Sequence, residues 1–181
     1  MAKQFEHLET DHQNFIAQQH MFFTASAGPD GRVNVSPKGM DSLYIAGPNR
    51  IMWLNLTGSG NETAGHILQN PRVTLMWCSF TKRPLILRAF GTARAIHPGD
   101  ADWDSLKPHF PPHSGARQIF DMQVDMVQTS CGYAVPFMEF SRDRDTLQTV
   151  FDGQTDQQIR DTWVKDNAVT IDGKPTGIPG S

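Results

Sequence analysis

Gly58-Ser59-Gly60-Asn61-Glu62-Thr63 stands between a short apolar run at residues 51–56 and a segment of helical spacing at residues 64–68. The order is strand, small polar loop and short helix, and an Asn-Pro pair ends the helix signal. Two glycines let the backbone approach a ligand closely. Hydroxyl and amide side chains offer hydrogen bonds, and the first N–H groups of a helix have no internal partner. The stretch therefore predicts an anion site, most usefully for a phosphate; the alternative is a helix start capped by Ser59 or Asn61 that binds nothing.

The segments on either side of this loop have the patterns of β-strands joined by turns. Residues 22–36 predict a β-hairpin, because apolar and polar residues alternate along its second strand. Gly91 indicates a bend or bulge of the kind that barrels use. Strands this frequent, with few full helices between them, predict an antiparallel barrel, and an amphipathic helix at 8–19 covers one end of it. The predicted strands are residues 20–27, 32–39, 42–45, 51–56, 72–80 and 85–95.

The second half of the chain is more irregular. Residues 98–121 predict turns and short helices, including one that Ser114 caps and that carries Ile119 and Phe120. The elements predicted after them are strands at 124–127, 132–135 and 137–140, a helical region at 145–166 with a capping box at 155–158, and a loop from 167 onward. We therefore expect a barrel domain with an N-terminal helix at residues 1–141. A helical and loop extension, residues 142–181, would pack on the same domain.

Composition excludes several classes of protein. The net charge of −3 is spread over mixed signs, which argues against a nucleic-acid partner. No run approaches the roughly 20 apolar residues of a membrane span, so we expect no membrane partner. The first residues lack the apolar segment of a signal peptide. Cys78 and Cys131 are far apart and predict free thiols in a reducing cytoplasm.

Familiar catalytic and metal motifs are absent from the sequence. The Gly58-to-Thr63 stretch lacks the third glycine and the later acidic residue of a dinucleotide fingerprint. His109 and His113 have helical spacing, but the prolines around them prevent a shared helical face, so we expect no metal site. Cys131 is a candidate nucleophile whose alternative is a small buried hydrophobe. We assign no catalytic residue.

Four segments, taken in order, resemble the pyridoxamine 5′-phosphate oxidase superfamily of FMN-binding split barrels. The resemblance covers about residues 15–140, and its carriers are residues 31–39, residues 58–63 leading to 70–73, residues 87–93 and residues 130–136. It implies a mainly β, α+β fold with peripheral helices: a six-stranded antiparallel split β-barrel. It also implies a homodimer with one FMN in each of two clefts at the subunit interface.

The resemblance also implies a set of cofactor-binding residues. The strand around Ser36 and Lys38 would lie along the flavin, and residues 58–63 would hold its phosphate. Arg88 would neutralise the phosphate or lie near the flavin, with a surface arginine as the alternative. Ser130 falls where the oxidases carry a tryptophan that approaches the flavin from the other subunit. The complete expected set is Asn34, Val35, Ser36, Lys38, Gly58, Ser59, Gly60, Asn61, Thr63, Arg88 and Ser130.

The sequence departs from the family pattern at two places, one in the expected phosphate site and one in the expected substrate site. Glu62 and Thr63 stand where the oxidases place a pair of basic residues, so phosphate binding would rest on hydroxyls, amides and cations elsewhere. The Arg-Leu-x-Pro ending that contacts the vitamin substrate is also absent. The inference of flavin binding survives these departures, and vitamin B6 oxidation is not expected.

Two classes of function follow from these expectations. The first is an FMN-dependent oxidoreductase acting on an unknown small substrate, with NADH or NADPH as a candidate partner; the flavin carries the chemistry and no protein acid or base is required. The second is a binding protein: a flavin carrier, a redox sensor, or a protein that holds haem or a deazaflavin instead. A haem protein requires an axial histidine, and no position in the sequence declares itself as one.

Overall fold

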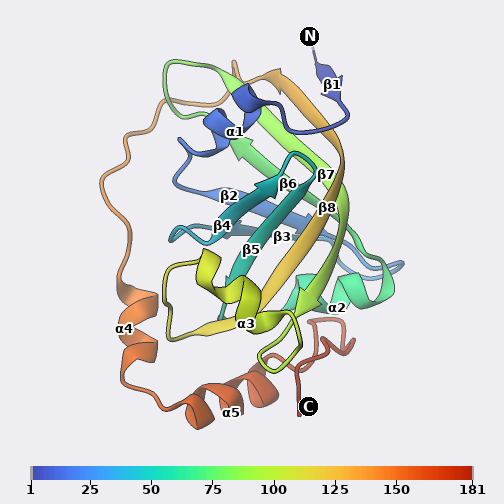
Figure 1. The fold of residues 1–181 in the computed structure, drawn as a ribbon, viewed down its shortest axis with the longest axis vertical. Coiled ribbons are helices and arrows are strands. Elements are labelled where there is room, and N and C mark those ends of the chain that lie inside the picture. Colours follow the sequence, from blue (N-terminus) through green and yellow to red (C-terminus); the bar gives the residue numbers. More distant parts are fainter. Residues whose placement is uncertain (1, 181) are drawn as a thin grey trace.

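The computed structural model describes residues 2–180 and is built around one antiparallel β-sheet, shown in Figure 1. The strands are β1 (Lys3–Phe5), β2 (Phe22–Ser26), β3 (Asn34–Lys38), β4 (Leu43–Gly47), β5 (Arg50–Leu56), β6 (Arg72–Cys78), β7 (Leu85–Ile96) and β8 (Ala116–Cys131). The helices are α1 (Thr10–Ile16), α2 (Glu62–Gln69), α3 (Trp103–Leu106), the 3-10 turn η1 (Lys107–His109), α4 (Thr146–Asp152) and α5 (Asp156–Asp166).

The sheet is an open, split barrel whose strands follow the order β3-β2-β6-β7-β8-β5-β4. The 16-residue strand β8 organises it, because β7 pairs along one edge while β5 and then β1 pair along the other. The prediction of a mainly β barrel with peripheral helices is confirmed. The number of strands differs: the sheet has eight rather than six.

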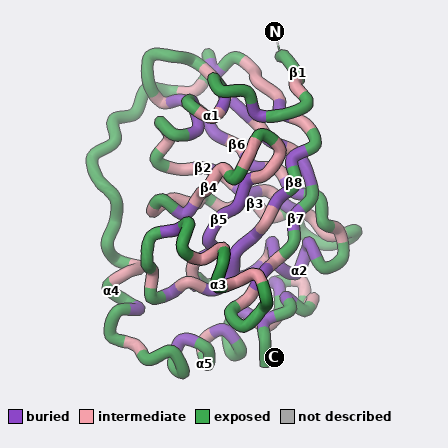
Figure 2. The backbone as a smooth tube through the Cα atoms, viewed as in Figure 1, coloured by how far each residue is buried: buried purple, intermediate pink, exposed green. Residues whose placement is uncertain are grey.

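Alternation of side chains along the strands produces the core. Leu75 and Trp77 of β6 and Leu87 and Ala89 of β7 are buried on the same inner face, and Figure 2 shows the buried residues concentrated on the central strands. Burial of each large apolar side chain contributes about 1.5–3 kcal/mol. The helix predicted at 8–19 is α1, which buries Phe15 and Ile16 against this core.

Two predictions for the second half of the chain are wrong. Residues 114–120 do not form a helix, because they enter β8, whose residues 117–120 are buried without the alternation that marks a strand in sequence. Residues 132–135 and 137–140 do not form strands. They lie beyond the end of β8 and form no strand pairing with the described residues, and Tyr133 and Phe137 are exposed.

The C-terminal residues fold as two helices and pack beside the polar loop at 58–61. The predicted capping box is confirmed: Thr155 and Gln158 bond reciprocally at the start of α5. Trp163 of α5 is buried, and its indole Nε1 donates to the Thr57 hydroxyl at 2.7 Å. This contact holds α5 against the end of β5, next to the loop that the sequence singles out. The boundary at residue 141 stays a prediction.

Candidate functional site

A cleft of about 770 Å³ opens beside β3 and has three walls. The first is β3 itself, and the second is the loop at residues 58–61 with the start of α2. The third wall is the C-terminal segment at residues 166–171. The strand, the loop and the tail are far apart in sequence, so the cleft exists only in the folded chain.

The structure brings most of the predicted site residues together. Side chains alternate along a strand, so the even-numbered residues of β3 share one face, toward the cleft. Val35 falls on the opposite face and is exposed. The predicted residues that line the cleft are Asn34, Ser36, Lys38, Gly58, Ser59, Gly60, Asn61 and Thr63.

Arg88 and Ser130 are predicted residues that do not line this cleft. They lie on the neighbouring strands β7 and β8, where Arg88 Nη1 donates to Ser130 Oγ at 3.3 Å. Leu87 and Ala89 on either side of Arg88 are fully buried, so Arg88 faces the outer side of the sheet. Within one chain these two residues are therefore separate from the cleft.

The start of α2 is open toward the cleft. Asn61 occupies the N-cap position of α2, as the alternative expected, but within residues 2–180 no side chain forms a capping hydrogen bond to this helix. Asn61 instead pairs with Gln118: Gln118 Nε2 donates to Asn61 Oδ1 at 3.0 Å. A Cβ atom added at Gly58 would meet nothing within 4 Å. The protein thus leaves both space and backbone N–H groups here for a ligand.

A chain of hydrogen bonds fixes Thr63 at the cleft wall. Its hydroxyl accepts from Asn34 Nδ2 and from Ser26 Oγ, both at 3.2 Å. Ser26 in turn lies 3.0 Å from His66 Nδ1, and both of these residues are buried. A hydroxyl that accepts twice keeps its own proton for a third partner. Thr63 can therefore donate a hydrogen bond to a ligand.

Two cations, Lys38 and Arg117, line the cleft, and neither forms an ion pair with a carboxylate of the described residues. Lys38 Nζ donates to Asn55 Oδ1 at 2.8 Å, and burial, together with the charge of Arg117, lowers the pKa of Lys38 to about 8. Arg117 is 2% exposed. Its Nη2 donates to the Gly60 carbonyl at 3.0 Å and its Nη1 to Asn167 Oδ1 at 2.5 Å, while its Nε has no partner among the described residues. Burial lowers the pKa of Arg117 to about 10.

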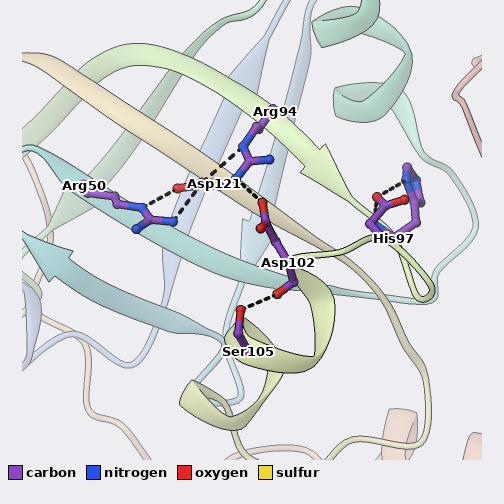
Figure 3. A network of polar contacts seen from close by, with 7 residues as sticks. Arg50, Arg94, His97, Asp102, Ser105 and Asp121 are labelled. Atoms are coloured by element: carbon purple, nitrogen blue, oxygen red, sulfur yellow. Dashed lines mark hydrogen bonds and ion pairs between the residues drawn. The ribbon is translucent and has the colours of Figure 1, made fainter.

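Another cluster of charges, shown in Figure 3, contains arginines that are paired with carboxylates, unlike Lys38 and Arg117. Arg50 Nε donates to Asp121 at 2.8 Å, and Arg94 Nη2 contacts Asp121 at 3.1 Å and Asp102 at 2.8 Å. Burial alone would raise the pKa of Asp121, but the hydrogen bonds from the two arginines outweigh it and lower that pKa. These arginines are neutralised by protein groups, whereas neither Lys38 nor Arg117 forms an ion pair within residues 2–180.

Sequence reasoning missed Arg117 and the C-terminal wall. Arg117 fell inside a helix predicted at the wrong place, and the residues after 167 read only as loop. The structure also explains Glu62, which stands out of place at an anion site. Its carboxylate accepts the backbone N–H of Ile171 at 3.1 and 3.2 Å and so ties the tail to α2. No local pattern announces these long-range contacts.

Residues 2–180 contain no group of three or more His, Cys, Asp or Glu residues placed to hold a metal ion. No helix in this range combines the length and apolar character needed to cross a bilayer. Cys78 and Cys131 are both free thiols.

The sequence of this chain is similar to the sequences of known proteins. Residues 8–131 match the family model described as pyridoxamine 5′-phosphate oxidase. A pyridoxamine 5′-phosphate oxidase family protein of Aspergillus flavus, ustO, is 35% identical over 147 residues, which cover 78% of this chain and 59% of the relative. The chain therefore spans about three-fifths of the length of this curated relative.

Solved structures agree on the fold. A protein from Lactobacillus delbrueckii superimposes with a TM-score of 0.54 at 21% identity, covering 68% of this chain and 94% of the other. A FAD-binding protein from Mesorhizobium loti gives a TM-score of 0.50 at 12% identity, covering 71% of this chain and 97% of the other. At these identities the likeness concerns the fold alone.

Proposed function

This chain belongs to the pyridoxamine 5′-phosphate oxidase family, and we propose that its cleft binds a flavin nucleotide, FMN, for an oxidoreductase reaction on a small substrate. The observation that carries the proposal is that Lys38 and Arg117 face the cleft without a carboxylate partner. A cation buried without a counter-charge is costly, and an anionic ligand would offset that cost. The Mesorhizobium loti protein of similar fold, which is a FAD-binding protein, supports a flavin as this ligand.

The donor set at the loop suits a phosphate. Ser59 and the Thr63 hydroxyl, with its proton free, lie on the same wall as the first N–H groups of α2. Anions are favoured at such a helix start. The empty space at Gly58 lets a phosphate oxygen approach the backbone. We therefore expect residues 58–63 to hold the phosphate of FMN.

The polar face of β3 suits the flavin ring. Asn34, Ser36 and Lys38 present hydrogen-bonding groups along one line of the cleft, where they would orient the ring. Bound FMN would supply the hydride or electron transfer, so the protein's task is to bind and orient. We expect NADH or NADPH of the reducing cytoplasm as electron donor, and a substrate other than pyridoxamine 5′-phosphate.

We also propose that the protein acts as a homodimer. The outer face of the sheet carries apolar side chains: Val35 is 62% exposed, and Phe90 pairs with Met126 on the same face. Arg88 and Ser130 lie on this face. A second copy packed here would cover apolar surface and would bring these two residues toward the other subunit's cleft.

Purified protein is expected to bind one FMN per chain, with the paired absorption bands of a flavin, and to have twice the 20.2 kDa mass of one chain by light scattering. Anaerobic NADH or NADPH should bleach the flavin. Bound flavin that neither donor reduces would favour a carrier instead of an enzyme. Protein that is colourless and also fails to bind added FMN would refute the proposal.

FMN affinity is expected to depend on pH through Lys38. The pKa of this residue is lowered from 10.5 to about 8, so it holds its proton at pH 7 and loses it as the pH rises through 8. Losing one charge-assisted hydrogen bond should weaken FMN binding about tenfold between pH 7 and pH 9.5. In the ligand-free protein the sign reverses: the unfolded chain binds more protons between about pH 8 and 10.5, so the stability rises with pH there.

Fluorescence titration with FMN at several pH values measures this effect. In the Lys38→Met variant the affinity should be lower at pH 7, and this pH dependence should disappear. An unchanged profile in the variant would show that Lys38 does not contact the flavin.

A further inference from the structure

The C-terminal segment at residues 168–176 folds as a tight hairpin, which we name the C-terminal hairpin. Thr170 N–H donates to the Lys174 carbonyl at 2.8 Å and Thr176 N–H to the Ala168 carbonyl at 3.0 Å. Gly173 turns the chain with φ of +73°, a conformation that glycine adopts without strain. Thr176 is also buried, and its hydroxyl donates to the Asn167 carbonyl at 2.5 Å. The hairpin is therefore a formed element and not a trailing end.

This hairpin is fastened to both of the other walls of the cleft. On the β3 side, the Arg32 N–H donates to Asp172 Oδ2 at 2.7 Å, and the Arg32 guanidinium pairs with the same carboxylate. On the α2 side, the Glu62 carboxylate accepts the Ile171 N–H. The Asn167 side chain donates to the Gly58 carbonyl at 2.9 Å just before the hairpin. The segment thus bridges the cleft from one wall to the other.

A glycine in α2 makes the close approach of the hairpin possible. A Cβ atom at Gly65 would lie 2.3 Å from Thr170 Cγ2 and 3.2 Å from the Pro175 carbonyl oxygen. Glycine inside a helix costs about 1 kcal/mol relative to alanine. Gly65 stands at the turn of α2 against which the hairpin packs, where a larger residue would not fit.

The hairpin presents apolar side chains to the cleft. Val169 and Ile171 line the cleft and are 55% and 73% exposed, and Val33 at the start of the opposite wall is 71% exposed. Exposed apolar side chains that gather at one opening indicate a surface that a ligand covers.

We propose that the C-terminal hairpin is a retaining wall of the flavin site and that Glu62 is its positioning residue; this inference rests on the proposed function. Glu62 has two opposing effects on FMN binding. Its negative charge at the mouth of a phosphate site weakens binding of FMN, whereas its hydrogen bond to Ile171 holds Val169 and Ile171 against the bound molecule. The second effect is the larger, because a hydrogen bond to a charged group acts at contact distance while the repulsion acts through solvent.

The test compares Glu62→Ala and Glu62→Gln with wild type, using FMN and riboflavin as probes. Riboflavin lacks the phosphate and so does not feel the charge of residue 62. Glu62→Ala should release both flavins about tenfold faster. Glu62→Gln keeps an acceptor oxygen without the charge and should restore slow release. Asp104→Ala is the matched control, since Asp104 is an exposed carboxylate with no ion pair within residues 2–180.

If charge alone mattered, Glu62→Ala would bind FMN more tightly and leave riboflavin unchanged; that result would overturn the proposal. Hydrogen exchange of the ligand-free protein supplies a readout that needs no flavin. The Ile171 amide should exchange about tenfold faster in Glu62→Ala, and equal exchange rates would also overturn the proposal. Faster exchange in a protein that binds no flavin would refute the proposed function and leave only the role of Glu62 in positioning the hairpin.

Gly65→Ala tests the same wall from the other side. Helix propensity predicts a more stable α2, but the added methyl group collides with the Thr170 side chain and crowds the Pro175 carbonyl oxygen, so we expect the hairpin to shift. We expect faster release of both flavins with α2 intact by circular dichroism. Unchanged release would argue against the hairpin as a retaining wall.

Discussion

Replacing Gly91 by alanine should destabilise the protein by about 3 kcal/mol, although alanine is ordinarily preferred to glycine within a strand by about 0.5–1 kcal/mol. Gly91 lies on β7, where pairing with β8 shifts by one residue between Phe90 and Gly91. A Cβ atom there would lie 2.0 Å from the Gln123 carbonyl oxygen and 2.9 Å from the carbonyl carbon. Both atoms are backbone, so no rotamer change relieves the collision.

The consequence reaches the whole barrel because β7 and β8 are its longest strands and pair along most of their length. Urea unfolding measures the loss. The matched control is Gly47→Ala, in β4, where an added Cβ meets nothing within 4 Å; its free energy of unfolding should change by less than about 0.5 kcal/mol. Equal stabilities of Gly91→Ala and wild type would mean that the two strands can separate here without cost.

Replacing Arg117 by methionine should reduce FMN affinity about a hundredfold, while two opposing terms limit the accompanying loss of stability. In the ligand-free protein, the substitution has two opposing effects on the free energy of unfolding: it removes a buried charge, and it removes hydrogen bonds. Burial lowers the pKa of Arg117 from 12.5 to about 10, which corresponds to roughly 3 kcal/mol against the charged form. Losing its hydrogen bonds to Gly60 and Asn167 costs about 1.5–3 kcal/mol each. The sum is a net loss of stability no larger than about 3 kcal/mol.

The effect of the substitution on FMN affinity has no such opposing term. The guanidinium is already desolvated and fixed, so an anion that arrives gains its attraction without further reorganisation. Arg50→Met is the matched control: it removes an arginine that Asp121 already neutralises, and FMN affinity should stay within about twofold. Fluorescence titration and urea unfolding of both variants measure the two effects separately. Wild-type affinity in Arg117→Met would remove this residue from the site.

How well the sequence predicted each region depends on where the contacts of that region are made. The hairpin of β2 and β3 and the strand-loop-helix unit at 51–69 are local, and their patterns predicted them correctly. Residues 117–120 are buried on both sides of β8, so their apolar run carries no period of two and was mistaken for a helix. Residues 132–140 have strand composition but no neighbour to pair with, and composition alone does not supply one.

In the candidate site, too, the features that depend on adjacent residues were predictable from the sequence, and those that depend on distant residues were not. The sequence alone determined the polar face of β3 and the loop at 58–63, because alternation and helix-start chemistry depend on adjacent residues. Only the tertiary structure decided that Asn61 turns to Gln118, that Arg117 reaches the loop from β8, and that Glu62 holds a hairpin more than a hundred residues later. These choices were settled by which buried donors and acceptors find partners across the fold. Satisfying them is a property of the whole packed chain, which no window of sequence contains.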